Sequence, residues 1–149
     1  MPIGKICNRE VVYVQRDVTV RAACKLMRHY HVGSLVVVDE IGGKRVPVGI
    51  ITDRDVVVEV DALELDLNVI TAGDIMSTDL ATVTENHGVL ETIELMHHRS
   101  VRRIPVVDAD NRLTGIVTVD DLLDVLAGEL GQIARIVSTE HKRKQHSRR

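Results

Sequence analysis

The chain has 149 residues, a net charge of −3, two tyrosines and neither Phe nor Trp. Its length suffices for one compact domain with an aliphatic core, and its mildly negative charge excludes a global attraction to nucleic acid or to an anionic membrane. No apolar run approaches the roughly 18 residues of a membrane span, and the N-terminal residues lack the apolar segment of a signal peptide. Cys7 and Cys24 form no CxxC motif and indicate no disulfide framework. We therefore expect a soluble cytoplasmic protein with reduced thiols.

The first half of the chain predicts a strand, a helix, two paired strands and a second helix. Apolar side chains recur at helical spacing after Thr19, whose hydroxyl can cap the helix. Two apolar runs flank a turn at Gly42-Gly43 and are predicted as strands. The expected ranges are 11–14, 34–38 and 46–51 for the strands, 39–45 for the turn, and 20–30 and 53–60 for the helices.

After a linker over 61–72, the second half predicts the same order of elements. The expected strands are 80–83, 103–107 and 113–117, and the expected helices are 89–98 and 119–126. A further short helix is expected over 128–137. The basic segment 141–149 contains no apolar residue, so we expect it to be disordered. The chain then divides into a first repeat with its linker (1–70), a second repeat (71–127) and a C-terminal segment (128–149).

The two halves are copies of one unit. Residues 4–39 aligned with 73–108 share 11 identities in 36 positions. Segments 49–55 and 115–121 then repeat a shorter pattern, in which a Gly, an apolar run and a Thr are followed by an Asp three residues later. Two copies are too few for a solenoid. We therefore expect an α/β (α+β) fold in which two β-α-β-β-α repeats pack about a pseudo-twofold axis.

Each copy of the short pattern places a Thr and an Asp where a predicted strand meets a predicted helix. The free N–H groups and the positive end of the helix dipole at such a junction can hold an anion. The same Thr-x-x-Asp spacing is also typical of a capping box, in which the two side chains only satisfy the N–H groups of the helix end. Both interpretations stay open from the spacing alone.

The whole unit resembles a tandem pair of cystathionine-β-synthase-type (CBS) domains, known as a Bateman module. The resemblance covers about residues 4–127. It rests on the repeated order of elements, the two Gly-to-Asp patterns, the run VRRIPVVD at 101–108 with its weaker partner at 32–39, and the openings GKIC at 4–7 and GDIM at 73–76. It implies a regulatory module and not an enzyme. It also implies two clefts between the repeats for an adenosine-containing ligand (AMP, ADP, ATP or NAD), and a homodimer.

The resemblance also assigns roles to single residues. The ribose hydroxyls are expected at Asp55 with Thr52, and at Asp121 with Thr118, because a carboxylate can accept from both hydroxyls of a cis-diol. Glycine leaves room for backbone to approach the ligand, and apolar strand residues can sandwich an adenine. The residues assigned to these last two roles are Gly49, Gly115, Val14 and Val83.

The predicted clefts differ in charge. The resemblance implies that Arg102 and Arg103 reach the phosphates of a ligand in the Asp55 cleft, and their paired planar donors suit phosphate. The matching residues Gly33 and Ser34 face the Asp121 cleft and carry no charge, and Ser34 is retained as a ligand-binding residue. A solvated pair of arginines at a strand start is the alternative.

The sequence also allows functions other than ligand sensing. A purely structural dimerisation module with empty clefts would need no ligand. Nucleic-acid binding through the basic tail is disfavoured because the tail lacks aromatic residues for base stacking. No nucleophile triad stands out, and the paired histidines are not spaced to share a helical face, so no metal site is expected. Apolar helix faces at Val20, Ala23 and Met27, and at Val89, Ile93 and Met96, predict homodimerisation.

Overall fold

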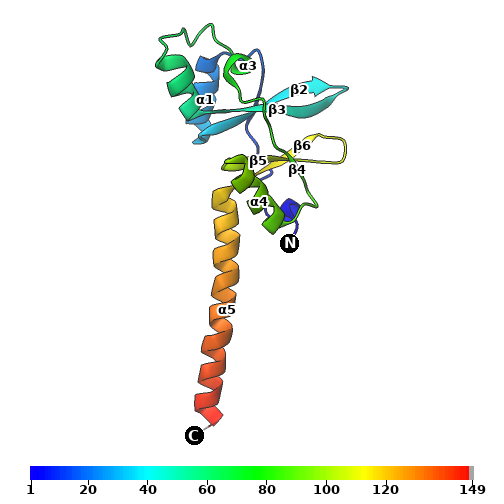
Figure 1. The fold of residues 1–149 in the computed structure, drawn as a ribbon, viewed down its shortest axis with the longest axis vertical. Coiled ribbons are helices and arrows are strands. Elements are labelled where there is room, and N and C mark those ends of the chain that lie inside the picture. The colour runs from blue at the N-terminus through cyan, green and yellow to red at the C-terminus, as the bar shows by residue number, and fades with distance from the viewer. Residues whose placement is uncertain (148–149) are drawn as a thin grey trace.

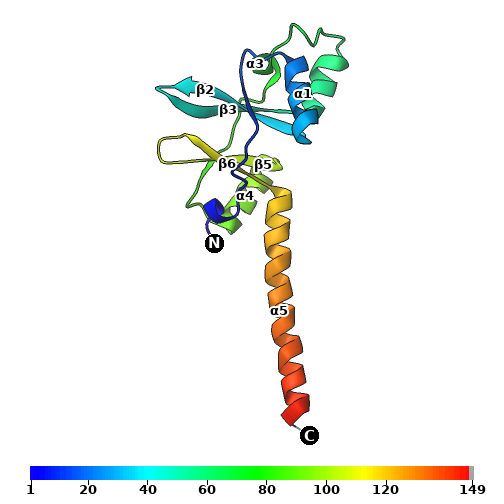
Figure 2. The ribbon, with the colours of Figure 1, turned by 180° about the vertical axis from the view of Figure 1, so that it is seen from behind.

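The computed structural model describes residues 1–147 and forms two three-stranded sheets, lying one above the other, with helices on their outer sides (Figures 1 and 2). The strands are β1 (Tyr13–Gln15), β2 (Ser34–Ile41), β3 (Lys44–Thr52), β4 (Val83–Thr84), β5 (Arg103–Val107) and β6 (Leu113–Thr118). The α-helices are α1 (Val20–Tyr30), α2 (Asp53–Val56), α3 (Ala72–Ile75), α4 (Val89–Arg99) and α5 (Val119–Ser147). A 3-10 turn, η1 (Ile3–Lys5), opens the chain, and a π-helical turn, η2 (Val57–Asp61), extends α2.

The two sheets have the same topology. In each, a short first strand runs parallel to the central strand, and the central strand pairs antiparallel with the third, giving the orders β1-β2-β3 and β4-β5-β6. Gly49 pairs with Val37 in the first sheet, and Gly115 pairs with Val106 in the second. A register shift follows immediately in both central strands. The predicted mixed α/β repeat is therefore confirmed.

Local signals explain the ends of the helices. The Thr19 hydroxyl accepts a hydrogen bond from the N–H of Ala22 at 3.2 Å and caps α1, as predicted. Helices α1 and α4 both end at a residue in the left-handed region, His31 and Ser100, each with φ of 54°. The hairpin between β2 and β3 is tighter than predicted, because Gly42 and Gly43 supply two positive φ angles and the strands continue up to them.

The two repeats exchange their opening segments. Ile3 is fully buried in the core of the second repeat, and its N–H donates to the carbonyl of His87 at 2.8 Å. Reciprocally, Ala72 and Met76 lie in the core of the first repeat, and the Ala72 N–H donates to the carbonyl of Val18 at 2.8 Å. Each repeat therefore completes its core with a segment of the other, which fixes the two sheets relative to each other.

The apolar helix faces that motivated the dimer prediction are not surfaces. Val20 and Ala23 are fully buried, and Met27, Val89 and Met96 are at most 8% exposed. They pack in the cores of their own chain. This basis for the homodimer prediction was wrong for these five residues, whereas Ile93, the sixth, is only partly buried.

The C-terminal segment differs from the prediction. A single 29-residue helix, α5, replaces the expected helix over 119–126, short helix over 128–137 and disordered tail, and it projects from the body (Figure 1). Gly128 and Gly131 lie inside this helix, because each weakens a helix by only about 1 kcal/mol, which good helix formers on both sides can offset. Residues 148–149 of the expected tail lie outside the described residues. None of the helices in residues 1–147 has the length and apolarity needed to cross a bilayer.

Candidate functional site

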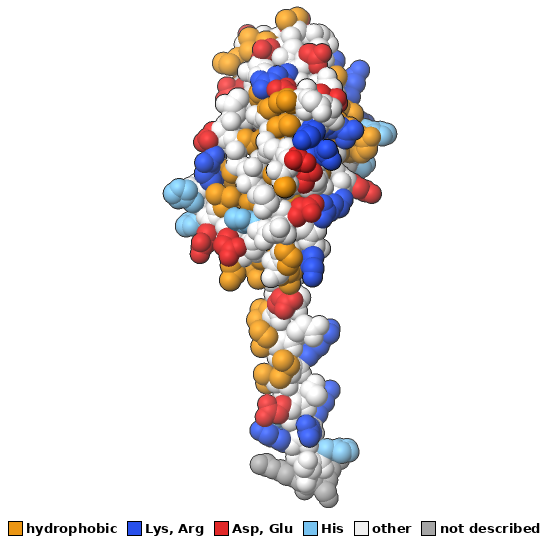
Figure 3. All heavy atoms as spheres, turned by 90° about the vertical axis from the view of Figure 1, so that its right-hand side faces the viewer, with side chains coloured by type: hydrophobic (Ala, Val, Ile, Leu, Met, Phe, Trp, Pro, Cys, Tyr) orange, Lys and Arg blue, Asp and Glu red, His pale blue; other side chains and the backbone are white. Residues whose placement is uncertain are grey.

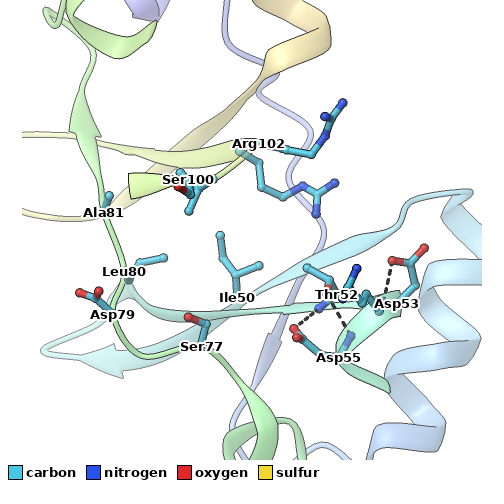
Figure 4. A pocket seen from close by; sticks show the side chains of 13 residues that line it. Ile50, Thr52, Asp53, Asp55, Ser77, Asp79, Leu80, Ala81, Ser100 and Arg102 are labelled. Carbon is cyan, nitrogen blue, oxygen red and sulfur yellow. Dashed lines mark hydrogen bonds between the residues drawn. The ribbon is translucent and has the colours of Figure 1, made fainter. Parts of the chain in front are cut away.

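A cleft of about 440 Å³ lies between the repeats, where β3 ends and α2 begins. One wall comes from the first repeat and the other from the second, so the cleft exists only because the two are packed together. Its volume is within the usual range for small-molecule sites. The lining residues are Ile50, Thr52, Asp53, Arg54, Asp55, Ser77, Asp79, Leu80, Ala81, Ser100, Val101, Arg102 and Arg103 (Figure 4).

Thr52 and Asp55 form a reciprocal capping box on one side of this cleft. The Thr52 N–H donates to Oδ2 of Asp55 at 2.9 Å, and the Asp55 N–H donates to the Thr52 hydroxyl at 3.1 Å. The capping interpretation of the motif is therefore correct for the structure. Within residues 1–147, the second carboxylate oxygen of Asp55 accepts no hydrogen bond. Half of the carboxylate is thus still available to a ligand in the cleft.

The sequence predicted free N–H groups for an anion at the start of α2, but the part of the chain that the structure describes has none there. The N–H of Asp53 donates to the Gly33 carbonyl at 3.0 Å. The N–H of Arg54 donates to Oδ1 of Asp53 at 2.8 Å, and Asp55 is occupied by the cap. Because the first helical donors are all satisfied, an anion in the cleft would have to be bound by side chains.

Arg102 and Arg103 supply such side chains from the opposite wall. They stand just before and at the start of β5, and Figure 4 shows Arg102 across the cleft from Thr52 and Asp55. Within the described chain neither guanidinium forms an ion pair or a side-chain hydrogen bond. The structure brings both arginines to the Asp55 cleft, where the sequence had placed them.

Sequence analysis did not predict that residues 77–81, near the start of the second repeat, form one wall of the cleft. Ser77 pairs with Ile50 through two backbone hydrogen bonds of 2.9 and 3.2 Å, which draw the following residues, Leu80 and Ala81, along the cleft. Together with Val101 they provide an apolar surface opposite the charged groups. The matching segments 4–7 and 73–76, which begin the two repeats, were the only indication in the sequence. They do not reveal that each segment packs against the other repeat.

Five of the predicted ligand-binding residues have other surroundings. Val14 and Val83 are each 4% exposed and lie in the two cores, so they do not line the cleft. A Cβ on Gly49 would come within 2.9 Å of the Ser77 carbonyl, and one on Gly115 within 3.0 Å of the Asn8 carbonyl. Both glycines thus make room for the exchanged segments. Ser34, which was predicted to face the Asp121 cleft, pairs with Thr52 in the sheet and is not a lining residue of the cavity of about 590 Å³ beside residues 8–12.

The second junction repeats the capping box without the arginines. The Thr118 N–H donates to Oδ2 of Asp121 at 2.9 Å, and the Asp121 N–H donates to the Thr118 hydroxyl at 3.2 Å. The segment equivalent to the Ser77–Ala81 wall, residues 8–12, lines a cavity of about 590 Å³ that extends under α1. Glu10 is its one charged lining residue, and neither Thr118 nor Asp121 is among the others. The two halves of the molecule are therefore unequal around the same motif.

The histidines and cysteines form no further site. Within residues 1–147, no three His, Cys, Asp or Glu side chains come together as metal ligands would. Burial raises the pKa of the Cys7 and Cys24 thiols, which favours the unreactive protonated form.

Comparison with known proteins agrees with this geometry. The CBS domain family matches residues 3–62 and again 72–128, so the chain belongs to the CBS domain family as a tandem pair. An uncharacterised protein of Methanopyrus kandleri is 37% identical over 123 residues, covering 83% of this chain and 61% of that protein. Hypoxic response protein 1 of Mycobacterium tuberculosis is 34% identical over 117 residues, covering 78% of this chain and 79% of that protein. These matches indicate no catalytic family.

Three solved structures have the same fold. The CBS domain pair of protein MJ0100, in complex with 5′-methylthioadenosine and S-adenosylmethionine, has a TM-score of 0.73 at 26% identity and covers 87% of this chain and 98% of that one. Hypoxic response protein 1, solved with two coordinated zinc ions, has a TM-score of 0.72 at 32% identity, with coverage of 83% and 98%. A hexameric CBS-CP12 protein from cyanobacteria has a TM-score of 0.73 at 29% identity, with coverage of 83% and 66%.

Proposed function

We propose that this protein is a regulatory sensor that binds an adenine nucleotide, such as AMP, ADP or ATP, between its two CBS repeats. The observation that carries the proposal is the Asp55 cleft, where a half-free carboxylate and two unpaired guanidinium groups face each other across an apolar floor. The solved pair with methylthioadenosine and S-adenosylmethionine supports an adenosine-containing ligand as the class.

Each part of a nucleotide finds a chemical partner in this cleft. The free oxygen of Asp55 can accept from a ribose hydroxyl, and Arg102 with Arg103 can bind a phosphate through paired donors. The apolar side chains of Ile50 and Leu80 can contact the adenine. NAD offers the same adenosine part and differs in the length of its charged chain.

A path from the cleft to the rest of the molecule begins at Arg102. Its carbonyl accepts the N–H of Val119, the first residue of α5, at 2.9 Å, so the cleft wall and the long helix are joined at one peptide. Arg102 also lines a groove between α4 and α5. A phosphate that reorients Arg102 can therefore change the surface that α5 presents to a regulated protein or to another copy of the chain.

Equilibrium titration of the purified protein tests the proposal. Adenosine, AMP, ADP, ATP and NAD are compared with GMP as a control that keeps the ribose and phosphate but changes the base. Saturable binding of at least one adenine ligand in preference to GMP is expected, together with an adenine compound detected by mass spectrometry of protein as purified. No binding of any of the five at millimolar concentration would contradict the proposal and favour a structural module with empty clefts.

A further inference from the structure

Helix α5 projects away from the body of the molecule (Figure 1) and carries a line of exposed apolar side chains (Figure 3). Every residue from 126 to 147 is exposed. Five apolar side chains, 41–68% exposed, follow one another at alternating spacings of three and four residues: Leu123, Leu126, Leu130, Ile133 and Val137. This spacing is the heptad seam of a coiled coil, in which apolar side chains at two positions of every seven face a partner helix. We call these five residues the α5 seam.

A projecting helix of this kind needs a partner. Helices without tertiary packing are marginal in water, and Gly128 and Gly131 weaken this one further. A contiguous exposed apolar stripe marks an interaction site. The body also exposes single apolar side chains, such as Val57, Val69 and Leu90, whereas the α5 seam repeats them at coiled-coil spacing along one helix.

We propose that the α5 seam binds the α5 seam of a second copy of this chain in antiparallel orientation. The charge distribution along α5 selects the partner and the direction. All the charged residues in the first half of the helix are acidic: Asp120, Asp121, Asp124 and Glu129. The second half is basic apart from Glu140: Arg135, Lys142, Arg143 and Lys144. Parallel helices would place like charges beside each other, whereas antiparallel helices place each acidic half along a basic half.

One antiparallel register pairs four of the five seam residues with each other and also matches the charges, while Leu123 lies opposite Glu140. With Leu126 opposite Val137 of the second copy, Leu130 lies opposite Ile133, and the pairs recur by symmetry at the other end. In the same register the basic residues 142–144 of one copy lie beside residues 119–121 of the other, where Asp120 and Asp121 stand. The apolar pairing thus sets a register in which these opposite charges also meet.

The seam continues into the body of the second copy. A groove of about 370 Å³ between α4 and α5 is lined by apolar side chains that include Ile93 and Met96, and by the first two seam residues, Leu123 and Leu126. In the register above, the segment around Val137 of the second copy passes this groove. Ile136, which stands beside the seam and is 66% exposed, is the side chain that fills it.

Sedimentation equilibrium of the full chain tests the use of the seam. The wild type is expected to be a dimer at about 10 µM. The variant Leu130→Glu/Ile133→Glu is expected to be a monomer, and its body should unfold at the same temperature as that of the wild type. The matched control Gln132→Glu/Ser138→Glu adds the same charge on the opposite face of α5 and should stay dimeric. A monomeric wild type, including one in which α5 folds back on its own body, would overturn the proposal. So would a dimer in the Leu130→Glu/Ile133→Glu variant.

Disulfide cross-linking tests the direction. A Leu126→Cys copy is mixed with a Val137→Cys copy under mild oxidation, and the cross-linked peptides are identified by mass spectrometry. Antiparallel pairing in the proposed register joins 126 to 137 in mixed dimers. Parallel helices hold those positions about 16 Å apart along the axis, too far for a disulfide, and would instead join each position to itself. Predominant 126–126 and 137–137 products would overturn the antiparallel arrangement.

Discussion

The two strand-to-helix junctions share one set of hydrogen bonds but lie in different surroundings. The capping boxes of Asp55 and Asp121 agree to within 0.1 Å in both bonds. Yet the first faces Arg102 and Arg103, whereas the equivalent residues on the other side are Gly33 and Ser34. A short motif therefore determines the local geometry of a junction, while its ligand preference depends on residues that the other repeat contributes.

The largest expected effect separates the two carboxylates. Asp55→Ala should weaken binding of AMP in its own cleft by about ten- to a hundredfold, since a lost hydrogen bond to a charged group is worth about 1.5–3 kcal/mol. Asp121→Ala should leave that cleft unaffected. Isothermal calorimetry of both variants measures the difference.

Loss of the cap has to be distinguished from loss of the ligand contact. Removing a capping side chain typically costs about 1 kcal/mol of stability, so Asp55→Asn, which keeps an oxygen for the Thr52 N–H, serves as the control. Unchanged affinity and stoichiometry in both alanine variants would show that neither carboxylate contacts the ligand.

A second comparison concerns the glycines that precede the two junctions. Gly49→Ala would bring a Cβ to 2.6 Å from the Met76 sulfur, and Gly115→Ala would bring one to 2.8 Å from the Cys7 sulfur. Each substitution overpacks an exchanged segment, which typically costs about 1–3 kcal/mol. Chemical denaturation measures both. Full stability of either variant would mean that the exchanged segment is not held as tightly as the structure has it.

Helix α5 predicts the opposite sign for a Gly-to-Ala change. Nothing lies within 4 Å of a Cβ built on Gly128, and the residue is helical. Gly128→Ala should therefore raise the helix content and stabilise α5 by about 0.5–1 kcal/mol. Circular dichroism during thermal unfolding reports it. Lower helicity in the variant would indicate that the chain bends at Gly128 in solution.

The smallest effect distinguishes Asp39 from its repeat counterpart Asp108. A hydrogen bond from the Arg16 side chain lowers the pKa of Asp39, whereas backbone N–H groups of Arg112 and Asp110 lower the pKa of Asp108. A pKa lower in the folded state contributes stability above the unfolded value of about 3.9, and that stability is lost as the pH falls through the folded value.

Acid unfolding below about pH 4 should accordingly become less steep in Asp39→Asn and in Asp108→Asn. The contribution of Asp39 should shrink more in 1 M salt than that of Asp108, because the close ion pair of Asp39 with Arg16 is screened, whereas Asp108 relies mainly on backbone hydrogen bonds and its ion pair with Arg112 is long, at 3.8 Å. Acid titrations followed by circular dichroism at low and high salt measure both. Equal salt sensitivity of the two variants would contradict the assignment of causes.

Much of the fold followed from local signals. The range of α1 agrees with the prediction because a good cap and a regular apolar period coincide there. The range of β5 agrees as well, since the apolar run has charged residues on both sides. The arginines were placed in the correct cleft through the family resemblance. None of these required knowledge of long-range contacts.

The remainder depended on contacts between distant segments. The exchange of Ile3 and Met76 between the cores has no local signature, so the close packing of the exchanged segments on Gly49 and Gly115 was not predicted. Val14 and Val83 are apolar strand residues, and only the packing of the sheet determines whether their side chains point into the core or toward the cleft. The continuity of α5 was missed because residues 119–126 and 128–137 were predicted as separate helices and the basic tail as disordered, although a heptad pattern runs from 123 to 137.

The inequality of the two clefts is tested most directly by the ratio of AMP to adenosine affinity. Calorimetric titrations of both ligands into the wild type, Asp121→Ala and Arg102→Ala/Arg103→Ala would measure it. We expect the Asp55 cleft to prefer AMP by the larger factor, since only it holds two guanidinium groups. In the double-arginine variant that preference should fall while adenosine binding is kept. Two identical, independent sites in the wild type, or an undiminished AMP preference in the double-arginine variant, would contradict the account.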